Sequence, residues 1–206
     1  MKTIKNPIQN EIIINKSSFI TFLTPMKDVE KAKEYINHLK NKYPDATHHV
    51  AGYIIGKTGE YAHFTDDGEP SGTAGLPSFE VLRKNEMTNV AYDIIRYFGG
   101  IKLGAGGLVR AYTKSLSDAL KMAEIIEIID YSYYHVDIDY SLLKPFENYF
   151  NERIIKRQFS NIVTLTIKVE KDKLANDLSI IQNLTSNLAK ITLLSEAFTD
   201  TLENDE

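Results

Sequence analysis

The 206-residue chain contains no cysteine. This absence excludes a disulfide-stapled scaffold, a zinc ribbon, an iron–sulfur cluster and a cysteine nucleophile. It fits the reducing cytoplasm, where we expect the protein to be located. Residues 1–7 include no apolar stretch of the kind that a secretory signal needs, so we expect no such signal. No apolar run approaches the ~20 residues of a membrane-spanning helix, and we therefore expect no membrane association.

A strongly basic composition is also missing. The chain has 24 Lys and Arg residues against 28 Asp and Glu residues, and its isoelectric point is near 5.8. A dedicated DNA-binding domain usually has an isoelectric point above ~9. The charge is nevertheless uneven: residues 83–121 hold seven basic and three acidic residues, whereas residues 122–206 hold eight basic and fifteen acidic residues. A local basic patch can attract a polyanion despite the net charge, and an ordinary solvated face is the alternative.

The order of predicted elements indicates two α+β domains. Hydrophobic residues make up 43% and charged residues 25%, as in chains that bury a proper core. In the first part, hydrophobic periodicity predicts strands at residues 11–15, 18–24, 48–55, 60–65 and 90–98, and helices at residues 28–41, 73–84 and 108–127. Residues 133–198 have the order β-α-β-β-α-β, which is the ferredoxin-like arrangement. We place the domains at residues 1–130 and 131–206, with the boundary at residues 130–132.

Two glycine-rich loops, within residues 66–75 and 96–110, each join a predicted strand to a predicted helix. Glycines permit positive φ and let backbone N–H groups converge, and a helix N-terminus adds a partial positive charge. This geometry suits a phosphate, and Arg96, Lys102 and Arg110 add cations. The Walker and dinucleotide-binding signatures are both absent, the latter because Val109 replaces its last glycine. An anion site is therefore one interpretation, and tight turns with close helix packing are the other.

Acid–base and metal chemistry have candidates of their own. They are His48, His49, His63, Asp66, Asp67, Glu69 and, as a nucleophile, Ser71. Adjacent strand residues point to opposite faces, so at most one of His48 and His49 joins a given site. No complete calcium loop, His-Glu-x-x-His motif or nucleophile elbow occurs. We favour a turn whose carboxylates accept backbone hydrogen bonds and cap the next helix. Tyr97, Phe98 and Tyr112 could stack on bases, although aromatics in strands and helices more often belong to the core.

Two blocks of sequence resemble the signature of the YigZ/IMPACT family. They are DDGEPSGTAGLP at residues 66–77 and RYFGGIKLGAGGLVRAY at residues 96–112, and His48-His49 upstream also resembles the family pattern. The resemblance covers residues 1–128 strongly, and the remainder resembles the smaller C-terminal domain of bacterial members. It implies a ribosomal-protein-S5-domain-2-like domain followed by a ferredoxin-like domain, a pair that resembles two consecutive domains of the translocation elongation factor. It also implies a link to translational control, with binding of nucleic acid, the ribosome or protein partners and without established catalysis.

These observations lead to a functional hypothesis. We expect a non-enzymatic, translation-associated protein that binds RNA, the ribosome or a translation factor through its N-terminal domain, without a cofactor or metal. The expected binding residues are His48, Asp66, Asp67, Glu69, Ser71, Thr73, Arg96, Gly99, Gly100, Lys102, Gly104, Gly106, Gly107, Arg110 and Lys114. Among them, we expect the basic side chains of Arg96, Lys102, Arg110 and Lys114 to contact phosphates. The alternatives are a phosphate-ester or small-molecule enzyme built on residues 66–69, and a pure protein-interaction module.

Arg110 has two possible roles. We place it in the first turn of a helix, where it can bind an anion jointly with the backbone N–H groups. The other role is an internal ion pair with Asp66, Asp67 or Glu69, which would lock the two loops together.

Overall fold

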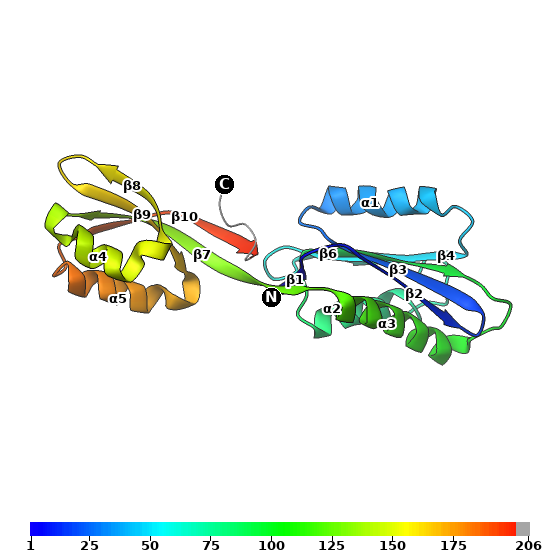
Figure 1. Ribbon diagram of the computed structural model, residues 1–206. Coiled ribbons are helices and arrows are strands. Elements are labelled where there is room, and N and C mark those ends of the chain that lie inside the picture. The colour runs from blue at the N-terminus through cyan, green and yellow to red at the C-terminus, as the bar shows by residue number, and fades with distance from the viewer. Residues whose placement is uncertain (201–206) are drawn as a thin grey trace. The chain divides into compact units, whose positions relative to one another are not determined.

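A computed structural model describes residues 1–200 of the chain. It divides into two compact units, Met1–Glu127 and the part from Ile128 onward, close to the boundary that the sequence predicted. Each unit combines an antiparallel sheet with helices (Figure 1), so the expected α+β class is confirmed. The acidic tail, residues 201–206, lies outside the described residues. Within the described range, no helix is long and apolar enough to cross a bilayer.

The first unit is built on a five-stranded antiparallel sheet in the order β2-β3-β6-β4-β5. The strands are β2 (Ile8–Ile14), β3 (Ser17–Pro25), β4 (His48–Ile55), β5 (Tyr61–Phe64) and β6 (Val90–Tyr97). The central strand β6 is buried along almost its whole length because helices cover both faces of the sheet. A short strand that the sequence did not predict, β1 (Lys2–Ile4), pairs with the start of β7.

Three helices cover this sheet (Figure 1). α1 (Val29–Lys42) lies on one face, and α2 (Gly75–Lys84) and α3 (Gly104–Met122) lie on the other. Asp28 begins α1 as predicted, because its carboxylate accepts the N–H of Lys31 at 2.8 Å. The larger core lies between the sheet and α2 and α3, and it includes the fully buried rings of Tyr92 and Tyr112.

The predicted limits of the third helix are wrong at both ends. α3 begins at Gly104 rather than Leu108, so three glycines that we expected in the loop form its first turn. Glycine is a poor helix former, but Leu108, Tyr112 and Leu116 bury one face of α3 and outweigh that cost. α3 ends at Met122 rather than residue 127, because the isoleucine-rich stretch that follows pairs as a strand with β1.

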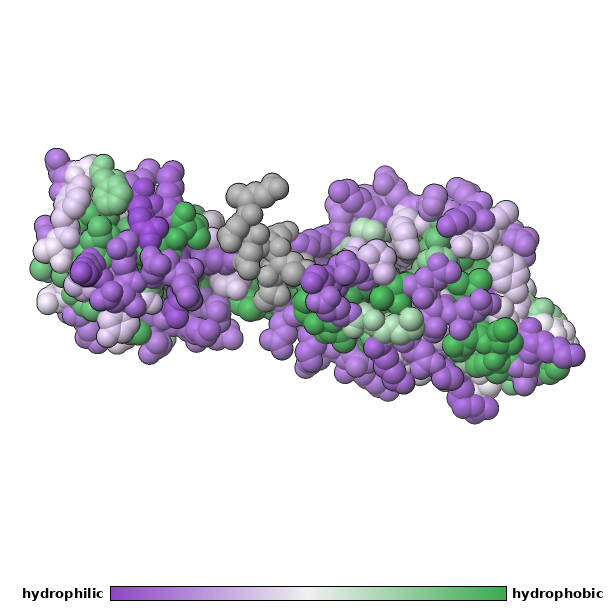
Figure 2. Space-filling view, viewed as in Figure 1, coloured by the Kyte–Doolittle hydropathy of each residue, from purple (hydrophilic) through white to green (hydrophobic). Residues whose placement is uncertain are grey.

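The second unit has the predicted β-α-β-β-α-β order. Its elements are β7 (Ile125–Ile138, of which the first three residues belong to the first unit), α4 (Leu143–Phe150), β8 (Ile154–Phe159), β9 (Val163–Glu170), α5 (Leu174–Leu184) and β10 (Lys190–Asp200). The strands pair antiparallel in the order β10-β7-β9-β8, and α4 and α5 pack on one face of the sheet over Val136, Phe146 and Ile181. This is the ferredoxin-like arrangement. In Figure 2, hydrophilic residues dominate the visible surface of each unit, with apolar residues showing between them.

Candidate functional site

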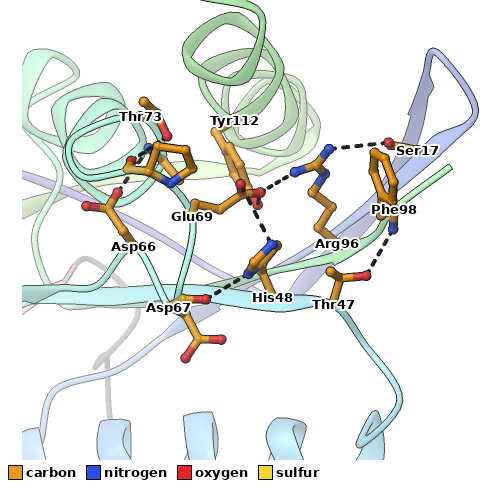
Figure 3. Close-up of polar contacts among 12 residues, drawn as sticks. Ser17, Thr47, His48, Asp66, Asp67, Glu69, Thr73, Arg96, Phe98 and Tyr112 are labelled. Carbon is orange, nitrogen blue, oxygen red and sulfur yellow. Dashed lines mark hydrogen bonds and ion pairs between the residues drawn. The ribbon is translucent and has the colours of Figure 1, made fainter. Parts of the chain in front are cut away.

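Both glycine-rich loops meet beside the neighbouring strands β4 and β6, where they enclose a pocket of about 430 Å³. Figure 3 shows the polar contacts of this region. The lining residues come from the start of β4, the first loop, the end of β6 and the start of α3: Thr47, His48, Glu69, Pro70, Arg96, Phe98, Lys102, Leu103, Gly104, Ala105 and Leu108. Five of the residues that the sequence predicted for binding therefore line one pocket, namely His48, Glu69, Arg96, Lys102 and Gly104.

Strand alternation decides which histidine reaches this pocket. His48 lies directly opposite Arg96 in the β4–β6 pair, and both side chains line the pocket. The next residue, His49, points to the other face of the sheet, where its ring contacts Asp93 and the carbonyl of Tyr43. Only His48 can therefore contribute to the pocket.

Glu69 is the buried centre of the site. Its Oε1 accepts hydrogen bonds from Nη1 of Arg96 and, at 2.7 Å, from the hydroxyl of Tyr112. Burial and the neighbouring Glu69 carboxylate raise the pKa of Tyr112, so the phenol keeps its proton and donates. The second oxygen, Oε2, lies 3.8 Å from Nε2 of His48, which is too long for a hydrogen bond.

Arg96 is buried and held on several sides. Its guanidinium carbon lies 5.4 Å from the ring centroid of Phe19 and 5.6 Å from that of Phe98, which is within cation–π range. Nη2 lies 3.5 Å from the hydroxyl of Ser17, and Nε is buried without a hydrogen-bond partner among the described residues. Only 5% of Arg96 is exposed. The side chain therefore cannot extend along a polyanion, and the expectation that Arg96 contacts phosphates in this way is wrong. It contributes one wall of the pocket instead.

The first two acids of the loop hold the backbone, as the favoured sequence interpretation stated. The Asp66 carboxylate accepts the N–H groups of Gly72, Ala74 and Gly75, and the last of these begins α2. Burial raises the pKa of Asp66, but these three hydrogen bonds outweigh it and hold the pKa below its ordinary value.

Asp67 is occupied in the same way, because its carboxylate accepts the N–H of His49 and the ammonium of Lys40. Among the described residues, no group of three or more His, Asp or Glu side chains is placed to hold a metal ion. Neither Asp66 nor Asp67 lines the pocket.

Ser71 and Thr73 also lie outside the pocket lining. The Thr73 hydroxyl donates to the carbonyl of Pro70 at 2.6 Å, within the turn that leads into α2. Ser71 is exposed in the same turn. These two residues therefore shape the first loop, and neither side chain forms a hydrogen bond with another of the predicted binding residues within the described part of the chain.

The second loop is fixed at one point and open at others. Gly99 lies so close to the backbone of Lys16 and Ser17 that a Cβ would overlap it, and its N–H donates to the Ser17 hydroxyl at 3.1 Å. Gly100 and Gly104 have φ of +84° and +70° with open space beside them. The first turn of α3, which includes Gly106 and Gly107, has no capping side chain and no acidic residue.

The predicted cations differ in availability. Lys102 is exposed at the pocket, and Arg110 is exposed on α3 with one guanidinium nitrogen 3.5 Å from where a Cβ of Gly106 would lie. Neither makes an ion pair with another described residue, so the predicted pairing of Arg110 with Asp66, Asp67 or Glu69 is not formed; Arg96 makes that pairing with Glu69 instead. Because α3 starts earlier than expected, Arg110 lies in its second turn. Lys114 bonds Asp118 one turn further on.

Several residues of the site carried no sequence signal for it. Ser17 is the first residue of β3, and its hydroxyl accepts the N–H of Gly99. Thr47 directly precedes β4, and its hydroxyl accepts the N–H of Phe98 at 3.0 Å. Phe98, which we assigned more readily to the core, is 47% exposed and forms a wall of the pocket. Tyr112, weighed with it as a stacking residue, belongs to the core.

The buried His49–Asp93 pair gives unit 1 a pH-dependent stability. Nδ1 of His49 lies 2.9 Å from Oδ2 of Asp93, and Nε2 lies 3.1 Å from the Tyr43 carbonyl, so both ring nitrogens face acceptors. Burial lowers the pKa of His49, but the hydrogen bond and charge of Asp93 outweigh it, and the pKa is raised above its ordinary 6.5. A raised pKa stabilises the folded state below the unfolded value, and this contribution is lost as pH rises through the folded value.

We expect the unfolding free energy of unit 1 to fall as pH rises above about 6.5, with a slope of at most about 1.4 kcal/mol per pH unit. This slope is measured by urea unfolding at a series of pH values between 5.5 and 8.5, with hydrogen exchange in peptides of unit 1 as the readout. His49→Gln should remove the slope attributed to this pair, whereas His63→Gln, at an exposed position of β5, should leave it. An equal slope in wild type and His49→Gln would contradict the assignment.

Comparison with known proteins places these features in a family context. Residues 15–120 match the Impact N-terminal domain family, and this range includes every residue that lines the pocket. The chain is 42% identical over 150 residues to the IMPACT family member YvyE of Bacillus subtilis (strain 168), covering 73% of this chain and 69% of that protein. It is 32% identical over 167 residues to the IMPACT family member YigZ of Escherichia coli (strain K12), covering 79% of this chain and 82% of that protein.

A solved crystal structure of a hypothetical protein resembles the fold as well. It superposes with a TM-score of 0.59 at 27% sequence identity, and the match covers 94% of this chain and 97% of the other. The likeness therefore extends through both units.

Proposed function

Because the chain belongs to the IMPACT family, a family of translation-related regulators, we propose that it acts in translation by binding RNA through the start of α3 and the pocket beside it. The observation that carries the proposal is the uncapped N-terminus of α3. Its first turn is made of glycine and alanine, without a capping side chain or an acid, and it lines the pocket together with Lys102. Such a helix end presents free N–H groups and about half a positive charge to an anion.

The cations around this helix end support the same proposal. Lys102 precedes the first turn of α3, and the guanidinium of Arg110 reaches back to Gly106 in that turn. Both charges therefore lie near the positive end of the dipole, where a cation is unfavourable by a few tenths of a kcal/mol up to about 1. Neither has an acidic partner among the described residues that would offset this cost. A phosphate bound between them and the N–H groups would offset it, and phosphates are the groups that RNA presents everywhere along its chain.

The alternative of a phosphate-ester enzyme fits the geometry less well. General acid–base catalysis needs carboxylates that face a substrate. Asp66 and Asp67 are engaged by backbone N–H groups and Lys40, and Oε1 of Glu69 is engaged by Arg96 and Tyr112. The loop therefore serves better as a scaffold for binding than as a source of free catalytic groups.

The double variant Lys102→Ala/Arg110→Ala tests the proposal. We expect wild-type protein to bind single-stranded RNA with an affinity that falls steeply with salt, and the double variant to bind at least about tenfold more weakly. Each lost phosphate contact should reduce the slope of log affinity against log salt by about 0.7, so the expected change is about 1.4. Fluorescence anisotropy with a labelled oligonucleotide measures both quantities.

Lys31→Ala/Lys33→Ala is the charge-matched control, because α1 lies on the opposite face of the sheet. It should change neither affinity nor slope. Since both mutated side chains of the test variant are exposed, its melting temperature should equal that of the wild type. A wild-type affinity that is flat with salt, or a drop of several degrees with binding retained, would count against the proposal and give Arg110 a structural role.

A further inference from the structure

The shape of the pocket suggests a more specific mode of binding. A volume of about 430 Å³ lies at the small end of the range for small-molecule sites, and the pocket is concave. A duplex offers its phosphates to an open surface, whereas a concave site of this size accepts one unstacked unit of a strand. The pocket therefore matches a single nucleotide rather than a helical segment of RNA.

One wall of the pocket is suited to a base. Phe98 is 47% exposed, its backbone is held because its N–H donates to Thr47, and the Arg96 guanidinium packs against its ring. Leu103 and Leu108 add apolar surface to the same pocket. An exposed aromatic ring held in place in this way is the usual platform on which unpaired bases stack.

The polar groups of the pocket select among bases. Nδ1 of His48 lies 2.8 Å from the Asp67 carbonyl, which can only accept, so Nδ1 donates to that carbonyl. Oε2 of Glu69, a residue only 7% exposed, lies 3.8 Å from Nε2 of His48 and makes no hydrogen bond with a described residue. A buried acceptor without a donor is unfavourable, and a ligand that brings an N–H group would satisfy it.

Among the bases, adenine, cytosine and guanine carry an amino group with two N–H bonds. Uracil has no amino group, and its single ring N–H lies between two carbonyl oxygens that the Glu69 carboxylate would repel. We propose that the pocket binds one unpaired nucleotide with an amino-bearing base, which stacks on Phe98, donates to Oε2 of Glu69, and has its phosphate at the start of α3. This inference rests on the proposed RNA binding and specifies which unit of RNA is recognised.

Binding of labelled eight-nucleotide homopolymers tests this inference. Wild-type protein should bind the adenosine and cytidine oligomers about tenfold more tightly than the uridine oligomer. Phe98→Ala should abolish this ratio, because a base that no longer stacks is not held in place to donate to Glu69. Phe98→Trp should keep the ratio because a ring remains. Tyr61→Ala removes a ring that is 62% exposed on β5, outside the pocket, and should leave the ratio unchanged. Melting temperatures show that each variant is folded.

Equal affinity for all three oligomers in the wild type would overturn the inference, as would a ratio that survives in Phe98→Ala. Either result would leave salt-dependent RNA binding, and with it the proposed function, intact. Titration with free adenosine and uridine monophosphates separates the sources of the ligand. If no RNA binds but adenosine monophosphate binds in a Phe98-dependent way, the proposed function fails and the pocket takes free nucleotides; if neither binds, both proposals fail.

Discussion

Replacing Glu69 by alanine is expected to destabilise unit 1 by about 3–5 kcal/mol, because the change leaves the buried Arg96 charge without its partner. Arg96 is only 5% exposed, and its remaining contacts are the rings of Phe19 and Phe98 and a 3.5 Å approach to Ser17. The buried Tyr112 hydroxyl would lose its acceptor as well. Urea unfolding followed by hydrogen exchange in peptides of each unit measures the effect, and the second unit should remain unchanged.

Glu30→Ala is the matched control, since it removes a carboxylate from an exposed ion pair with Lys33 at the start of α1. Its cost should stay below about 1 kcal/mol. The double variant Glu69→Leu/Arg96→Met should recover much of the loss, because apolar residues of similar volume often replace a buried ion pair at little cost. Equal destabilisation by Glu69→Ala and Glu30→Ala would show that the Arg96–Glu69 pair does not hold the loops together.

Replacing Gly99 by alanine is expected to destabilise unit 1 by about 3 kcal/mol, at the upper end of the cost of overpacking. The new Cβ would overlap the carbonyl of Lys16 and the amide nitrogen of Ser17. These are backbone atoms of a tight turn in which Asn15 and Lys16 have φ of 47° and 65°, so they cannot move without disturbing the β2–β3 hairpin. The same shift would break the hydrogen bond from the Gly99 N–H to Ser17.

The neighbouring Gly100→Ala separates crowding from backbone strain. Gly100 has a φ of +84° but no heavy atom within 4 Å of the position that an alanine methyl group would take, so alanine should cost only about 1–2 kcal/mol from the left-handed backbone. The difference between the two variants, measured by urea unfolding, reports the close approach of Gly99 to Lys16. A smaller loss for Gly99→Ala than for Gly100→Ala would show that the loop does not pack on this turn.

The parts of the fold that could be predicted from the sequence are those determined by residues close together in the chain. The β-α-β-β-α-β order of the second unit could be predicted because alternating apolar residues and turn residues mark each element in turn. The capping role of the 66–75 loop was also predictable, because the carboxylate of an Asp before a helix accepts backbone N–H groups and the glycines permit the turns between. The limits of α3 could not be predicted from the sequence, because its glycine-rich first turn is held by packing of residues further along the helix.

Some features of the candidate site could likewise be predicted from the sequence, and others could not. The sequence alone determined the two glycine-rich loops, the family resemblance, and the rule that only one of His48 and His49 can face a given site. It left open whether Arg110 binds an anion or pairs with the acidic loop, it assigned Arg96 to phosphate contacts, and it assigned Phe98 more readily to the core. Only the tertiary structure decided that Glu69 pairs with Arg96 and that Phe98 walls a pocket. The physical reason is that pairing and exposure depend on strand register and on the close approach of Gly99 to Lys16, which join residues some eighty positions apart.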